Sequence, residues 1–118
     1  MSRSYQIFMK QKIEEKCLED LVSKLNGYKN DIGDFTIQKQ DSCIWINYTG
    51  AKIDEEYYAE EIEEVLTAYN FNIMYVINIE LSSGDYSDEA AVNFYKELKK
   101  INRDSILMNQ DGEYFSYD

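Results

Sequence analysis

Apolar side chains recur along this chain at two spacings, and each spacing predicts a type of secondary structure. Residues 4–26 contain neither Gly nor Pro, and their apolar residues recur every three or four positions, which predicts one long amphipathic helix closed by Gly27. A short strand at Tyr5–Met9 before a shorter helix is the alternative. We prefer the single helix because Phe8 breaks the alternation of a half-buried strand.

The middle of the chain alternates in the manner of strands. Phe35–Gln38 and Ile44–Tyr48 alternate on either side of the polar segment Gln40–Ser42, which predicts an antiparallel hairpin. Asn72–Leu81 is the most apolar stretch and carries apolar side chains on both faces. It is therefore expected at the centre of the sheet, covered on both sides for part of its length.

Two further helices and a closing hairpin complete the pattern. Asp54 is a candidate N-cap for a helix over residues 54–69, and Ser87 begins another helix. The first would bury Tyr58, Ile62, Val65, Leu66 and Tyr69, and the second Ala91, Phe94, Tyr95, Leu98 and Ile101. Residues 106–108 and 113–117 form the last hairpin. The order α-β-β-α-β-α-β-β predicts a two-layer α+β fold, with three helices on a mostly antiparallel sheet.

Length and composition limit the function more than they identify it. The 118 residues predict a single domain, residues 1–118. No histidine is present, which excludes most general-base and Ser-His or Cys-His mechanisms. The formal net charge of −11 repels phosphate backbones and anionic lipid headgroups, so we expect neither direct nucleic-acid binding nor membrane binding.

Cellular location follows from cysteine usage and the apolar runs. Cys17 and Cys43 occupy apolar positions and are expected to be reduced, buried thiols, although two cysteines also allow one disulfide. The first residues lack a signal-peptide core, and no apolar run approaches the length of a membrane span. A cytoplasmic protein, monomeric or dimeric, is the expectation.

Negative charge is concentrated in one part of the chain. Residues 1–53 hold 8 basic and 7 acidic residues, whereas residues 54–118 hold 4 and 16. Glu60, Glu61, Glu63 and Glu64 lie inside the predicted helix, where like charges four residues apart cost about 0.2–0.5 kcal/mol per pair. One interpretation is a solvated face that keeps the protein soluble. The other is a surface for a basic partner, unless lysines of the first helix lie opposite.

Aromatic residues accompany the acids. The chain has 11 tyrosines and one tryptophan, and these side chains often anchor protein interfaces. Trp45 lies on the hairpin face opposite Ile44 and Ile46. The candidate partner-binding residues are Trp45, Glu56, Tyr57, Glu60, Glu61, Glu63, Glu64, Asp85, Tyr86, Asp88 and Glu89.

Three stretches of the sequence bear on function. Ile46–Ile53, Asn78–Glu89 and Ile106–Tyr114 resemble small acidic immunity proteins of bacterial polymorphic and contact-dependent toxin systems. In those proteins a strand ends in a short acidic loop before a helix, and a hairpin with Asp-Gly-Glu or similar closes the chain. The resemblance implies a cytoplasmic inhibitor that covers the active site of a cognate toxin, often a basic nuclease. No binding residue transfers from it.

These observations give three hypotheses. The first is a non-enzymatic immunity protein that binds a basic toxin domain, with no cofactor and no bound metal. The second is a nucleic-acid mimic that inhibits a DNA- or RNA-binding protein, which requires acids along both sides of an elongated surface. The third is a small carboxylate or metal-dependent enzyme.

Overall fold

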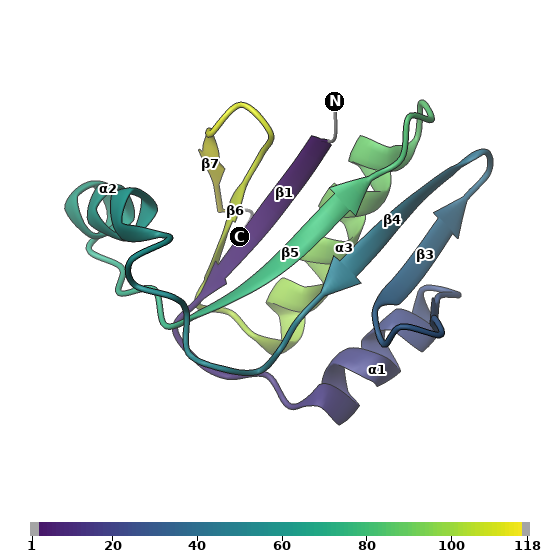
Figure 1. Ribbon diagram of the computed structural model, residues 1–118, viewed down its shortest axis with the longest axis horizontal. Helices are drawn as coiled ribbons and strands as arrows, with labels where there is room; N and C mark the ends of the chain where they lie inside the picture. Colours follow the sequence, from purple (N-terminus) through teal and green to yellow (C-terminus); the bar gives the residue numbers. More distant parts are fainter. Residues whose placement is uncertain (1–2, 117–118) are drawn as a thin grey trace.

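The computed structural model describes residues 3–116 and contains three helices and a seven-stranded sheet within that range (Figure 1). The strands are β1 (Arg3–Met9), β2 (Tyr28–Lys29), β3 (Phe35–Lys39), β4 (Ser42–Asn47), β5 (Tyr75–Leu81), β6 (Ser105–Met108) and β7 (Tyr114–Phe115). The helices are α1 (Glu15–Lys24), α2 (Ala59–Tyr69) and α3 (Ser87–Ile101). The α+β class is thereby confirmed.

The sheet has the order β2-β3-β4-β5-β1-β6-β7, and every neighbouring pair is antiparallel. β5 is the central strand, as its two-sided apolar pattern predicts. Ile77 and Ile79 of β5 belong to the main core, whereas Val76 packs against a second apolar cluster on the other face. The β3–β4 hairpin and the helix that begins at Ser87 are also confirmed.

The prediction of one helix over residues 4–26 is wrong. The segment forms strand β1 and then helix α1. This is the alternative of a short strand before a shorter helix, which was set aside because Phe8 breaks the alternation. β1 pairs with β5 and β6, and its second half is covered on both faces: Ile7 and Met9 enter the main core, and Phe8 enters the second cluster. Where a strand is buried on both faces, apolar and polar residues no longer alternate along its sequence. The observed order is therefore β-α-β-β-β-α-β-α-β-β.

Gly27 is needed for close packing, not for the left-handed residue that ends α1. Asn26 adopts the left-handed conformation, with φ 64°. At Gly27, a side-chain Cβ would approach the Thr36 carbonyl oxygen to 2.6 Å and Ile37 Cγ1 to 2.8 Å. The absence of a side chain at Gly27 lets the end of α1 lie directly against β3.

The helices cover both faces of the sheet, so the two-layer prediction is incomplete. Residues of α1 and α3 pack on the face that carries Ile7, Ile44 and Ile79. Val65 of α2 packs instead with Phe8, Phe71 and Ile106 on the opposite face. Figure 1 shows α2 at one side of the sheet, with no helix in front of β3 and β4. We call this uncovered part of the second face the open face; it carries Thr36, Trp45, Asn78 and Glu80.

Other boundaries differ by local causes. Residues 55–58 form a turn before α2, so the helix begins at Ala59 and not at Asp54. Leu66 and Tyr69 are 42% and 49% exposed, although the helical stripe predicts burial, because α2 packs on a small cluster along a narrow contact. The last hairpin forms from β6 and β7, and Tyr117 of its predicted second strand lies outside the described residues.

Candidate partner-binding surface

Helix α2 is held in place by a cap and by an aromatic contact. Asp54 Oδ1 accepts hydrogen bonds from the backbone N–H groups of Glu56 (3.0 Å) and Tyr57 (3.1 Å), so Asp54 caps the turn that leads into the helix. The ring of Tyr58 packs edge-on against Phe8 at 6.0 Å, and its hydroxyl donates to Asn78 Oδ1 at 3.2 Å. These contacts fix the start of α2 against β1 and β5.

The acidic side chains of α2 face solvent or the edge of the second cluster. Glu60, Glu63 and Glu64 are exposed, and Glu61 is half-buried, with its Oε2 shielded from solvent and without a hydrogen-bond partner. Within residues 3–116, no ion pair reaches a glutamate of α2. We call Glu60, Glu61, Glu63 and Glu64 the acidic face of α2.

Basic residues of the first helix do not neutralise this face. α1 lies on the other side of the sheet, and its lysines have acidic neighbours there. Lys16 pairs with Asp20 at 3.3 Å, and Lys24 pairs with Glu97 of α3 at 3.5 Å. The internal explanation of the acidic helix, in which lysines of α1 lie opposite it, is therefore excluded.

Two tyrosines next to α2 have raised pKa values. The Tyr114 hydroxyl lies 3.5 Å from Glu64 Oε2, and partial burial, followed by the charges of Glu64, Glu61 and Glu60, raises the pKa of Tyr114 to about 12. Burial raises the pKa of Tyr58 as well; the Asn78 hydrogen bond opposes that shift, and nearby Glu61 adds to it. The carboxylates thus act together on the groups that border the helix.

Aromatic side chains project beside the acids. Tyr57 is 77% exposed, and its ring packs edge-on against the ring of Tyr58 at 4.7 Å. This contact holds the exposed ring in position. Trp45 of β4 is 36% exposed on the open face. Asn47 and Asn78 pair across β4 and β5, and Tyr58 donates to that Asn78, so the open face continues to the start of α2.

The predicted residues of the 85–89 segment lie elsewhere. This segment follows the end of β5, whereas α2 precedes its beginning, so the two acidic groups lie at opposite ends of that strand. Asp88 accepts a hydrogen bond from the Tyr5 hydroxyl at 2.7 Å, and Glu89 pairs with Lys39 at 2.7 Å. Asp85 is exposed, and Tyr86 is half-buried with its backbone N–H bound to Ser42 Oγ. The structure does not join the two groups into one patch.

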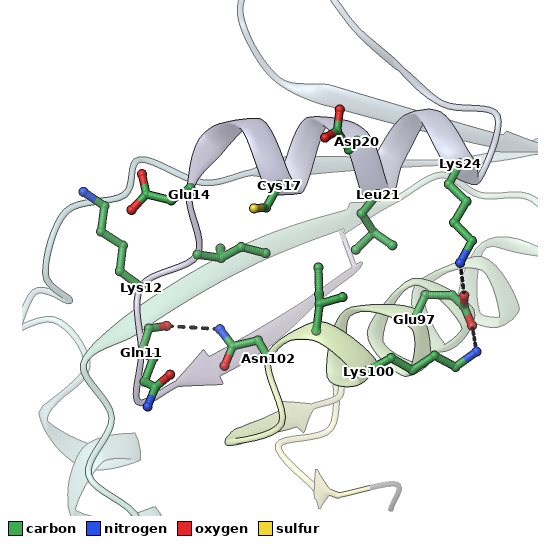
Figure 2. Close-up of a pocket in the computed structure, with 12 residues that line it drawn as sticks. Gln11, Lys12, Glu14, Cys17, Asp20, Leu21, Lys24, Glu97, Lys100 and Asn102 are labelled. Carbon is green, nitrogen blue, oxygen red and sulfur yellow. Dashed lines mark hydrogen bonds and ion pairs between the residues drawn. The ribbon is translucent and has the colours of Figure 1, made fainter.

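Sequence reasoning missed Tyr28 and a groove on the other side of the sheet. Tyr28 is 56% exposed on β2, a strand of two residues too short to show alternation. The groove, of about 470 Å³, lies between α1 and the end of α3 (Figure 2). Cys17 and Ile101 line this groove and are exposed, although both were expected to be buried.

The rim of this groove carries both signs of charge. Glu97 pairs with Lys100 at 2.7 Å and with Lys24 at 3.5 Å, and the hydrogen bond from Lys100 lowers the pKa of Glu97. Asn102 Nδ2 donates to the Gln11 carbonyl oxygen at 3.1 Å at the other end. The groove is therefore apolar inside and electrostatically balanced at its rim, unlike the acidic face of α2.

Among residues 3–116, no group of three or more Cys, Asp or Glu side chains is placed to hold a metal ion. Cys17 and Cys43 are free thiols. No helix within the same range has the length and apolar character that crossing a bilayer requires.

Comparison of the chain with models of protein families, with curated proteins and with solved structures finds no match.

Proposed function

We propose that this chain is a non-enzymatic immunity protein, which binds and neutralises a cognate toxin domain with a basic surface. The acidic face of α2, together with exposed Tyr57 and Trp45, forms the binding surface. The observation that carries the proposal is that the acidic face of α2 has no cationic partner within residues 3–116. Repulsion between the like charges destabilises the helix in isolation. A basic surface that covers the helix offsets this repulsion and stabilises it.

Carboxylates on this face would occupy the positions of substrate phosphates against the arginines and lysines of the toxin. Charge on one helix also steers diffusional encounter, which favours fast capture of a toxin in the cytoplasm. Asp88 and Glu89 hold partners within the chain, so the proposal gives them a secondary role.

Shape argues against the nucleic-acid mimic. The chain measures 38 × 30 × 28 Å along its principal axes, so it is not strongly elongated. A mimic of a duplex requires an elongated body with acids along both sides. We therefore rank it below the immunity protein.

Protection of growing cells tests the proposal. The chain is co-expressed with the toxin domain encoded by its genomic neighbour, either unchanged or with Glu60, Glu63 and Glu64 changed to Lys. The matched control changes Glu14, Glu19 and Asp31 to Lys; all three are exposed and none lies on α2.

We expect the unchanged chain and the control to protect cells, and the α2 variant to lose protection. Complex formation by the purified proteins should follow the same order. Equal protection by both variants would show that the acidic face is not the binding surface. Failure of the unchanged chain to protect or to bind would overturn the immunity function itself.

A further inference from the structure

Four side chains form one row across the open face. Tyr28, Thr36, Trp45 and Glu80 are successive cross-strand partners on β2, β3, β4 and β5. Partners of this kind point to the same side of a sheet, with Cβ atoms about 4.5–5.5 Å apart. Tyr28 and Trp45 are 56% and 36% exposed, whereas Thr36 between them is only 5% exposed. The row therefore presents two aromatic rings and a carboxylate to solvent.

Glu80 is the charged strand residue of this face, and the Asp34 carboxylate borders the face, where it accepts a hydrogen bond from Asn47 Nδ2 at 2.9 Å. The strand residues that share the open face are Ser4, Gln6, Tyr28, Thr36, Gln38, Cys43, Trp45, Asn47, Asn78 and Glu80, as the strand registers show. Among these described positions, Glu80 alone is charged. Glu80 is exposed and has no ion pair within residues 3–116, and Trp45 has no ring or cation contact in the same range.

We propose that Trp45 and Glu80 bind one arginine side chain of the protein partner. This assignment rests on the proposed function and names the group that the open face recognises. A guanidinium group stacks on the face of an indole ring and donates two parallel hydrogen bonds to a carboxylate. Trp45 and Glu80 are direct cross-strand neighbours, so one guanidinium group can contact the ring and the carboxylate together.

The charge of the row selects this occupant over two others. A nucleic-acid base would also stack on Trp45, but its phosphate would lie close to the Glu80 carboxylate. A second copy of the chain carries the same formal charge of −11, and its open face would place Glu80 against a like surface. An arginine is attracted by both the ring and the carboxylate.

The single tryptophan of the chain makes the assignment directly measurable. Its indole N–H gives one NMR resonance, which is followed together with the backbone amide resonances of the whole chain while acetyl-Gly-Arg-Gly-amide is added. The same peptide with neutral citrulline in place of arginine is the ligand control. Glu80→Gln tests the carboxylate, and Glu19→Gln is the matched variant at an exposed position of α1, outside both proposed binding surfaces.

We expect saturable shifts centred on Trp45 and Glu80 with the arginine peptide and none with citrulline. Glu80→Gln should weaken binding about fivefold, and Glu19→Gln less than about twofold. Equal binding of citrulline, or largest shifts on α2 or in the α1–α3 groove, would overturn the assignment. Movement of the indole resonance on dilution of the protein alone would assign the row to self-association and also overturn it.

Protection of cells separates this assignment from the proposed function. Glu80→Gln and Trp45→Leu, which keeps an apolar side chain in the row, should both reduce protection against the toxin domain. If both variants protect fully while the α2 lysine variant does not, the immunity function stands and the assignment of the row fails. If the unchanged chain does not protect, the immunity function fails, and the peptide titration still decides whether the row binds arginine.

Discussion

The hydroxyl of Tyr114 lies 3.5 Å from Glu64 Oε2, where the short strand β7 meets the acidic face of α2. Glu64 and Tyr114 are 50 residues apart in sequence, and the contact places a phenol within the field of several carboxylates. Tyr114 is therefore a built-in probe of the charge of α2.

Alkaline titration should show this directly. The pKa of Tyr114 is about 12 in the folded chain, against about 10 for an unperturbed tyrosine. The folded state keeps the proton to higher pH than the unfolded state, so the free energy of unfolding should fall as pH rises from about 10 to about 12. Tyr114→Phe should make this loss shallower in denaturant unfolding measured across that range. An unchanged slope would contradict the assignment.

Removing charge from α2 should act on stability and on Tyr114 together. Glu60 and Glu64 are exposed and four residues apart, so changing both to Gln relieves a like-charge pair and should add about 0.2–0.5 kcal/mol to the free energy of unfolding. The pKa of Tyr114 should fall only part of the way toward 10, because burial is its largest cause. Thermal unfolding and absorbance titration measure these two effects. A clear loss of stability would reveal a structural role for the acids.

The close approach at Gly27 predicts a large effect from a small substitution. Gly27→Ala places a Cβ 2.6 Å from the Thr36 carbonyl oxygen, and a backbone atom of the sheet cannot move cheaply. We expect a loss of about 1–3 kcal/mol in denaturant unfolding. Ser23→Ala, at an exposed position of α1, should change stability by less than about 0.5 kcal/mol. Similar effects from the two variants would mean that α1 does not lie tightly on β3.

Salt should control the rate at which the partner is captured. If the acidic face of α2 steers association, the on-rate for the toxin domain should fall steeply between about 0.01 and 0.15 M salt, because the Debye length falls from about 30 to 8 Å. The off-rate should change little. Ala at exposed Tyr57 should instead speed dissociation, as expected for an aromatic anchor. Surface-immobilised kinetics measure both rates, and an on-rate that is insensitive to salt would remove α2 from the interface.

Local pattern was enough to predict several parts of the fold. Burial alternates along β4, and Ser87 begins a helix whose buried residues include Ala91, Phe94 and Leu98. The apolar faces of Asn72–Leu81 likewise predicted the central strand. In these segments the propensity of the chain and its final burial agree, so short-range spacing carries the information.

The sequence by itself thus determined the α+β class, the central strand and the acidic character of α2, because each depends on the type and spacing of residues that are close together in the sequence. Only the tertiary structure decided that Tyr5–Met9 is a strand, since the burial of Phe8 on the second face breaks its alternation. The tertiary structure also placed α2 on the face opposite α1, away from the lysines of that helix, and aligned Tyr28, Trp45 and Glu80 in one row. Strand order and register are set by contacts between distant segments, which no local spacing encodes.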